Sequence, residues 1–241
     1  MKKLILLVLS LTMVVSLCAC GGSGETPNNN ETTPSLEENT GTQTQTMDEL
    51  LSSAIRIDND SFLKECSSNI AKVSNDYEGK PCVVEGFISE IQKDHIVLYY
   101  SYLHLNVYIP TEQIIELQTE QYIEVVGTLE NLTYDMYSGA FADLTTAYVS
   151  KDTFTITGEY YYYNSTDGTH PQDACLKLTG VSNIQCIDDS KVEYIGLDKK
   201  DEQLKALENG SAITVEGKLL NNYWDNTPNK TAYIMIDIVI K

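Results

Sequence analysis

The sequence predicts a mostly β protein with minor α content: two tandem five-stranded barrels, each with a short helix between its third and fourth strands, and an N-terminal helix before them. Three observations predict this. Two halves of the 241-residue chain repeat the same order of segments, apolar residues alternate with period two, and glycines interrupt segments that otherwise resemble strands. Glycines inside strands supply the bulges and bends that the corners of a small barrel need.

The first half of the repeat contains a glycine-broken strand, two further strands, a short helix, a second glycine-broken strand and a last strand. The predicted bounds of the four clearest segments, in order, are 79–88, 112–117, 122–129 and 142–149. Between them, alternation places one apolar set on a single face of a strand: Leu103, Leu105, Val107 and Ile109.

The second half repeats this order with similar spacing. Its corresponding segments are 154–160, 202–207, 211–219 and 232–240. Alternation in the last of them predicts one shared apolar face: Ile234, Ile236, Ile238 and Ile240.

Five strands with a helix between the third and the fourth are typical of the OB-fold. We therefore expect two OB-like barrels, over about 75–150 and 151–241. An amphipathic stretch over 62–73 predicts a helix in front of the first barrel, so the first domain is expected to span 47–150.

The first half also resembles a known family. Tyr77-x-Gly79-Lys80, then Val84-x-Gly86-x-Ile88 and Val125-x-Gly127-x-Leu129, with Asn69 in the preceding helix, resemble the tRNA-anti-like OB domains of bacterial secreted proteins. This resemblance implies an OB-fold over roughly 48–150 and no catalytic motif. The second half, with Ile213-x-Val215-x-Gly217-x-Leu219, is similar to an uncharacterised domain of bacterial secreted proteins.

The N-terminus has the features of a secretory signal. Lys2 and Lys3 precede an apolar run from Leu4 to Leu17, which is too short for a stable transmembrane helix. Leu17-Cys18-Ala19-Cys20 resembles the lipobox of bacterial lipoproteins, which implies a signal peptide over 1–19, lipidation of Cys20 and an extracytoplasmic protein anchored to the cell membrane. The alternative is a secreted protein cleaved nearby.

A polar segment follows the lipobox. Residues 20–46 consist largely of Gly, Ser, Thr, Asn, Gln, Glu and Pro, a composition that cannot bury enough apolar surface to fold. We therefore expect a disordered tether between the anchor and the barrels.

The charge of the chain argues against nucleic acid as a partner. The formal net charge is −19, and loss of residues 1–19 with Lys2 and Lys3 takes it to −21. Such a surface repels phosphate backbones, and no basic stripe gathers the lysines.

The sequence lacks recognisable catalytic signatures. His95, His104 and His170 lie far apart, without an HxH, HExxH or CxxC motif nearby, and there is no nucleophile elbow or glycine-rich phosphate loop. We expect no enzymatic activity, no cofactor and no metal site, and we interpret the acidic residues between 188 and 202 as a solvated loop.

Aromatic residues carry the strongest binding signal, with sixteen tyrosines against one tryptophan and four phenylalanines. Tyrosines gather around the second and third strands of barrel 1, the face on which OB-folds bind oligomeric ligands, and a similar group occurs in barrel 2. The alternative is that tyrosine simply suits half-exposed strands. The candidate ligand-face residues are Tyr99, His104, Tyr108, Tyr161, Tyr223 and Trp224.

Four cysteines remain after the lipobox: Cys66, Cys82, Cys175 and Cys186. The local pairs, Cys66 with Cys82 and Cys175 with Cys186, are disulfide candidates in an oxidising exterior. The alternative is that these cysteines are buried apolar side chains.

Together these observations predict a non-enzymatic binding or adaptor module, anchored outside the cytoplasm, that recognises an envelope polymer or protein through its tyrosine-bearing strands. The alternative is a structural component of an envelope protein complex without a small ligand.

Overall fold

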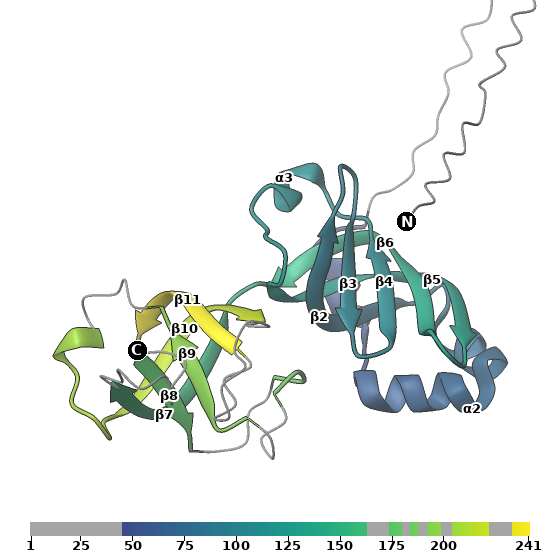
Figure 1. Ribbon diagram of the computed structural model, residues 1–241. Helices are drawn as coiled ribbons and strands as arrows, with labels where there is room; N and C mark the ends of the chain where they lie inside the picture. Colours follow the sequence, from purple (N-terminus) through teal and green to yellow (C-terminus); the bar gives the residue numbers. More distant parts are fainter. Residues whose placement is uncertain (1–44, 163–173, 180–183, 188–191, 199–203, 222–232) are drawn as a thin grey trace, which may run out of the picture. The chain divides into compact units, whose positions relative to one another are not determined.

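The computed structural model describes residues 45–162, 174–179, 184–187, 192–198, 204–221 and 233–241 (Figure 1). Residues 43–241 form one compact unit. Within the described residues, no helix is long and apolar enough to cross a membrane.

Two helices and a short strand precede the first barrel. Helix α1 (Met47–Ser53) begins with a capping box, in which the Thr46 and Glu49 side chains each accept a hydrogen bond from the other's backbone N–H. Strand β1 (Ile55–Arg56) pairs parallel with β2, and helix α2 (Asn59–Tyr77) follows.

Helix α2 covers the predicted stretch over 62–73 and extends beyond it at both ends. Its N-cap, Asp58, accepts a hydrogen bond from the Ser61 N–H at 2.9 Å, which satisfies one of the free donors of the first turn. At Asn69 the backbone leaves the helical conformation, and the Asn69 side chain accepts from the Lys72 N–H at 3.1 Å. Asn69 therefore caps the second half of a kinked helix.

Barrel 1 has the predicted OB arrangement. Its elements are β2 (Pro81–Ile91), β3 (Ile96–Tyr100), β4 (Leu103–Val107), α3 (Thr111–Ile114), β5 (Tyr122–Asp135) and β6 (Gly139–Lys151). The strands follow the order β2-β3-β4-β6-β5, and β5 pairs back onto β2 to close the barrel. The pair β4 and β6 is parallel, whereas the other four pairs of the barrel are antiparallel.

Barrel 2 repeats this topology. Its elements are β7 (Phe154–Tyr162), β8 (Ala174–Leu178), β9 (Tyr194–Leu197), the 3-10 turn η1 (Leu204–Ala206), β10 (Ala212–Asn221) and β11 (Tyr233–Ile240). The sheet closes in the order β10-β11-β9-β8-β7, with β9 and β11 parallel. The two tandem five-stranded barrels predicted from the repeat are confirmed. The predicted boundary at 150 and 151 falls at the end of β6.

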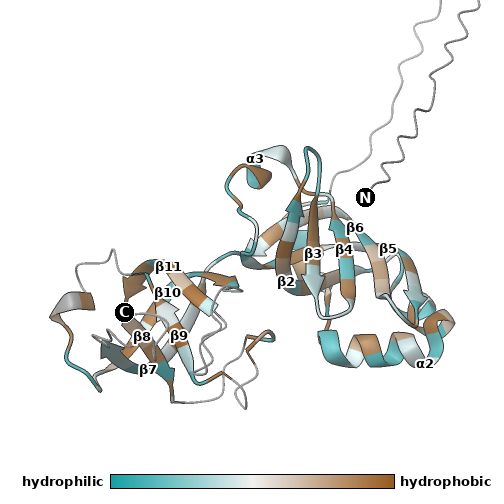
Figure 2. Cartoon of the chain, in the orientation of Figure 1, coloured by the Kyte–Doolittle hydropathy of each residue, from teal (hydrophilic) through white to brown (hydrophobic). Residues whose placement is uncertain are grey.

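The interior of barrel 1 is filled by alternating apolar side chains. The predicted set Leu103, Leu105, Val107 and Ile109 is buried. Figure 2 shows the alternation of apolar and polar residues along the strands. From α2, Phe62, Cys66 and Val73 belong to the same core, so this helix covers the barrel interior with its apolar face.

The predicted apolar face of the last strand is wrong for its first half. In β11, Met235 is fully buried, while Ile234 and Ile236 are only partly buried. Asp237 has a positive φ of 52°, and the register with β10 shifts between Glu216 and Lys218. This bulge reverses the alternation, so that Ile238 and Ile240 pack against the core beyond it.

Gly217 lies opposite this bulge and explains why a glycine interrupts β10. A Cβ atom added to Gly217 would lie 2.6 Å from the Ile236 carbonyl oxygen, closer than a side chain can approach. The glycine in the middle of β10 therefore allows the bulged strand β11 to approach it closely.

The helix between the third and fourth strands of barrel 1 is shorter than the sequence predicts. The predicted segment 112–117 forms only the single turn α3, and the described part of 202–207 forms η1. Isolated helices of this length are marginal, and tertiary packing decides how much of them forms.

Aromatic side chains join the two barrels. Phe87 from β2 and Tyr122 from β5 belong to the core of barrel 2. The ring of Phe87 is stacked on that of Tyr233, with centroids 5.9 Å apart and an angle of 2° between the planes. The rings of Tyr122 and Phe154 are 5.2 Å apart.

Candidate binding face

The outward-facing side chains of three neighbouring strands form a continuous surface on barrel 1. Backbone register places Tyr99, His104 and Phe141 in one row across β3, β4 and β6. The next row contains Val97, Asn106 and Asp143. We call this surface the β3–β4–β6 face, and its members are Val97, Tyr99, His104, Asn106, Phe141 and Asp143.

The first row is an aromatic plate. The rings of His104 and Phe141 are stacked, with centroids 4.8 Å apart and 9° between their planes, and the Tyr99 ring lies 5.0 Å from His104. Phe141 is 38% exposed, which leaves ring surface available to a partner. Burial lowers the pKa of His104, so the imidazole is neutral at pH 7 and stacks as an uncharged ring.

The second row has two polar members, Asn106 and Asp143, beside Val97, and we call it the polar row. One oxygen of Asp143 accepts a hydrogen bond from the Asn106 amide at 2.9 Å, and the other accepts from the Asn131 amide at 2.7 Å. Each carboxylate oxygen has a further lone pair with which it can accept another hydrogen bond. Asp143 is thus fixed in position as an acceptor beside the aromatic plate.

A second aromatic pair lies beyond the polar row. The strand alternation continues outward to His95 and Tyr108, whose ring centroids are 5.1 Å apart, and Tyr108 is 39% exposed. His104 lies in β4 and Tyr108 directly follows this strand, and four residues of extended chain correspond to about 13 Å. The polar row is therefore flanked by aromatic surface on both sides.

Exposed apolar side chains also mark the rim of the face. The turn between β5 and β6 carries Met136 and Tyr137, which are 74% and 82% exposed. Tyr102, in the turn between β3 and β4, is 62% exposed, and its carbonyl accepts from the Ala140 N–H at 2.8 Å. Large exposed apolar groups gathered in this way are typical of interaction sites.

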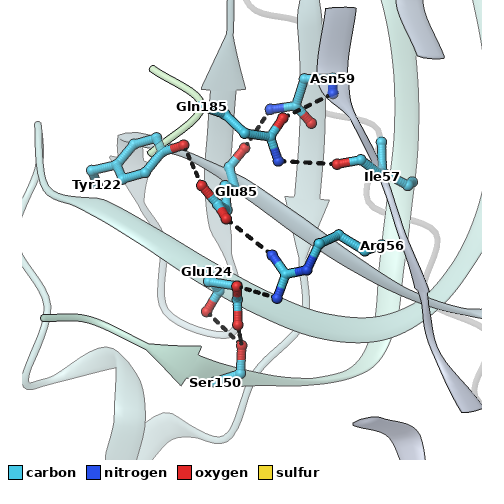
Figure 3. A network of polar contacts seen from close by, with 8 residues as sticks. All are labelled: Arg56, Ile57, Asn59, Glu85, Tyr122, Glu124, Ser150 and Gln185. Atoms are coloured by element: carbon cyan, nitrogen blue, oxygen red, sulfur yellow. Dashed lines mark hydrogen bonds and ion pairs between the residues drawn. The ribbon is translucent and has the colours of Figure 1, made fainter. Parts of the chain in front are cut away.

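A buried polar network lies on another part of barrel 1 (Figure 3). Glu85 and Glu124 lie opposite each other on β2 and β5, and Arg56 bridges them: its two terminal nitrogens are 3.0 Å from Glu85 and 2.7 Å from Glu124. Tyr122 donates to Glu85 at 2.7 Å, and Ser150 donates to Glu124 at 2.8 Å. Burial raises the pKa of Tyr122 far above its ordinary value, so this hydroxyl remains a donor.

The network continues into barrel 2 through Gln185. Its side-chain oxygen accepts from the Asn59 N–H at 3.0 Å, and its amide donates to the Ile57 carbonyl at 3.0 Å (Figure 3). The Tyr100 hydroxyl donates to the Gln185 carbonyl at 3.2 Å. Because both carboxylates are paired with Arg56 and hydrogen-bonded, we interpret this network as structural.

A pocket lies in barrel 2. Tyr160, Tyr162, Leu207, Glu208 and Asn209 line a cavity of about 500 Å³. The Asn209 side chain bonds to the backbone of Tyr162, accepting from its N–H at 2.7 Å and donating to its carbonyl at 3.3 Å.

The structure brings three of the predicted ligand-face residues together and separates a fourth. Tyr99, His104 and Tyr108 lie on or beside the β3–β4–β6 face, whereas Tyr161 belongs to barrel 2, where its hydroxyl donates to Glu159 at 2.9 Å. Tyr223, Trp224 and Cys20 lie outside the described residues.

Sequence reasoning missed four members of the face: Val97, Asn106, Phe141 and Asp143. The prediction began the last strand of barrel 1 at Ala142, but β6 begins at Gly139. The outward alternation of Phe141 and Asp143 was a usable signal. The sequence could not predict which residues of β4 lie beside them, because the parallel pairing of β4 and β6 joins segments more than thirty residues apart.

The four predicted disulfide candidates are free thiols in the described part of the chain. Cys66 and Cys82 lie in the core of barrel 1, Cys175 is buried in β8, and Cys186 is partly buried near the junction of the barrels. Burial raises the pKa of Cys66 and of Cys82 to about 11 and that of Cys175 to about 12, which makes these thiols poor nucleophiles at neutral pH.

Comparisons with known proteins support the fold of the N-terminal half. The comparison with curated proteins found no match. Among solved structures, a mitogen derived from Streptococcus dysgalactiae is 8% identical, with a TM-score of 0.22. That alignment covers 70% of this chain and 62% of the mitogen, and a similarity this weak indicates neither a shared fold nor a shared function. The family model described as tRNA_anti-like matches residues 1–107, which include the N-terminal helices and barrel 1 through β4.

Proposed function

We propose that the chain is a non-enzymatic binding module, held outside the cytoplasm by a lipid on Cys20, that binds an extended polymer of the cell envelope through the β3–β4–β6 face. The observation that carries this proposal is the placement of a fixed polar row between two aromatic surfaces.

The topology supports the choice of face. The second and third strands of OB-folds are the surface on which this fold binds oligomeric ligands, and β3 and β4 are those strands in barrel 1. The Met136 and Tyr137 side chains lie in the turn between the fourth and fifth strands, a loop that OB-folds also use for binding.

Electrostatics restrict the class of polymer. The two rows contain the carboxylate of Asp143 and neither lysine nor arginine. The chain as a whole carries a net charge of −19. A polyphosphate backbone would be repelled, so the family name does not make tRNA the favoured ligand.

A sedimentation assay tests the binding function. Full-length protein in mild detergent is mixed with envelope fragments of the organism that encodes it, and the bound fraction is measured after centrifugation. We expect Phe141→Ala and Tyr108→Ala each to weaken binding by about tenfold, because each removes one aromatic surface.

Leu51→Ala is the matched control, since Leu51 has the same exposed fraction as Phe141, 38%, but lies on α1. All three variants should unfold within about 0.5 kcal/mol of the parent. If the parent protein does not bind envelope fragments, or if Leu51→Ala loses as much affinity as Phe141→Ala, this function is wrong.

The anchor is tested separately by the Cys20→Ser variant. In cells supplied with labelled fatty acid, the parent should incorporate the label and fractionate with membranes. The Cys20→Ser variant should do neither. A variant that stays membrane-bound would contradict lipid anchoring at Cys20.

A further inference from the structure

Resting on the proposed function, we further propose that the occupant of the β3–β4–β6 face is the sugar chain of an uncharged glycan. The pattern of the face, the spacing of its rows and the closure of the barrel all favour this occupant.

The pattern of the face matches the two-sided chemistry of a sugar ring. A pyranose ring presents C–H groups on its faces and hydroxyl groups around its edge. The exposed surface of Phe141, stacked on His104 and adjacent to Tyr99, offers a flat apolar plate for such a face.

The polar row beside the plate suits the hydroxyl edge of the sugar. Both oxygens of Asp143 are held by amides, from Asn106 and Asn131, and each can accept a further hydrogen bond from a hydroxyl group. Hydroxyl-to-carboxylate hydrogen bonds are among the stronger ones available to a neutral ligand. A phosphate group would meet like charge at the same position.

The spacing of the aromatic surfaces indicates a chain rather than a single sugar. His104 in the first plate and Tyr108 in the second are about 13 Å apart along the extended chain. A single ring stacked on the Phe141 plate cannot also contact the pair formed by His95 and Tyr108. A linear oligosaccharide can contact both and bridge the polar row between them.

Closure of the barrel argues against an extended polypeptide as the occupant. Peptides commonly bind sheets by adding a strand to an open edge, where backbone groups are unpaired. Here β3, β4 and β6 each pair with a strand on both sides, so their backbone hydrogen bonds are already made. Recognition must then rely on side chains.

The experiment compares differently treated envelope fragments as targets for the full-length protein in mild detergent. One sample is untreated, a second is digested with nuclease, and a third is extracted with hot detergent and digested with protease. A fourth sample receives both treatments, so that only the glycan remains. We expect each digested sample to bind within about twofold of the untreated one, and Phe141→Ala to weaken binding to the glycan by about tenfold.

The Asp143→Asn variant gives a result whose sign depends on the ligand. It replaces one accepting oxygen with a donor and removes one negative charge, so binding to a sugar chain should weaken severalfold. Binding to a phosphate polymer would strengthen instead, because a repulsive charge is lost.

Saturation-transfer NMR then identifies the contacted groups. With soluble fragments released from the digested glycan by a glycosidase, irradiation of the protein's aromatic protons should saturate sugar-ring protons. Saturation confined to other groups of the fragments would overturn the inference.

The outcomes separate this inference from the function on which it rests. Loss of binding after protease indicates a polypeptide ligand, and loss after nuclease indicates a nucleic acid. Either result overturns the glycan inference while the binding function stands. Failure of the parent protein to bind even the untreated fragments overturns both.

Discussion

At the scale of single residues, Arg56 has a role that no other residue of the chain can fill, because it is the only arginine in the sequence. It bridges Glu85 and Glu124, whose side chains are only 8% and 10% exposed and lie directly opposite each other on neighbouring strands. Like charges in that arrangement destabilise a sheet, and a planar guanidinium with two donating nitrogens can pair with both carboxylates.

We predict that Arg56→Gln lowers the free energy of unfolding by about 2–4 kcal/mol, because it leaves two buried carboxylates without a cation. Arg56→Lys should lose less, since it keeps the charge but not the fork geometry. Urea denaturation of both variants measures the effect.

The matched control adds Glu85→Gln and Glu124→Gln to Arg56→Gln. If the two uncompensated carboxylates cause the loss, removing their charge should restore part of the stability. If Arg56→Gln alone changes the free energy of unfolding by less than about 0.5 kcal/mol, the Arg56 bridge contributes little to stability.

At the scale of elements, the contact between α2 and β2 determines the state of two cysteines. Cys66 on α2 and Cys82 on β2 share one core with Phe62 and Val73. The sequence left open whether these two thiols form a disulfide. In the structure they pack as free apolar side chains.

We predict that, without reductant, alkylation at pH 8 labels none of the four cysteines from Cys66 to Cys186 in the native protein and all four in urea. Burial raises the pKa of each thiol, so the native protein contains little thiolate at this pH. Peptide mass mapping provides the measurement.

A pair of peptides linked through sulfur would contradict this prediction.

The same pKa shifts of the cysteine thiols have a consequence for stability. Because the thiols ionise more easily when the chain is unfolded, stability should fall as the pH rises above about 8.5, the ordinary thiol pKa.

The strands could be predicted from the sequence where local pattern determines them. Leu103, Leu105 and Val107 alternate without interruption, and their predicted burial is confirmed. The inward face of β11 was mispredicted for its first half because the bulge at Asp237 changes which residues face inward. A bulge depends on pairing with β10 rather than on local composition. The length of α3 was overestimated for a similar reason, since packing limits how much of a short helix forms.

At the scale of the whole molecule, the repeat in the sequence predicted the tandem barrels, because each half carries the same order of strands and glycines. The binding face was predictable only in part. Tyr99, His104 and Tyr108 stood out as aromatic residues on the second and third strands, where the fold commonly binds. Phe141 and Asp143 join them only through the parallel pairing of β4 with β6, which the sequence does not reveal.

Gln185 links the two barrels through side-chain hydrogen bonds. It connects the start of α2 to a segment of barrel 2 more than a hundred residues away, through hydrogen bonds to Asn59 and Ile57. Nothing local in the sequence marks Gln185. Its role arises from the way the two barrels pack through Phe87, Tyr122 and Tyr233.

Hydroxyl-radical footprinting reports which aromatic side chains a bound polymer covers, and it therefore tests whether the β3–β4–β6 face is the binding surface. The full-length protein is oxidised briefly with and without envelope fragments, and the modification of each aromatic residue is read by mass spectrometry. We expect Phe141 and Tyr108 to be protected severalfold, while Tyr162, which is 46% exposed on barrel 2, is modified equally in both samples. Protection of Tyr162 with no change at Phe141 and Tyr108 would contradict the β3–β4–β6 face as the binding surface.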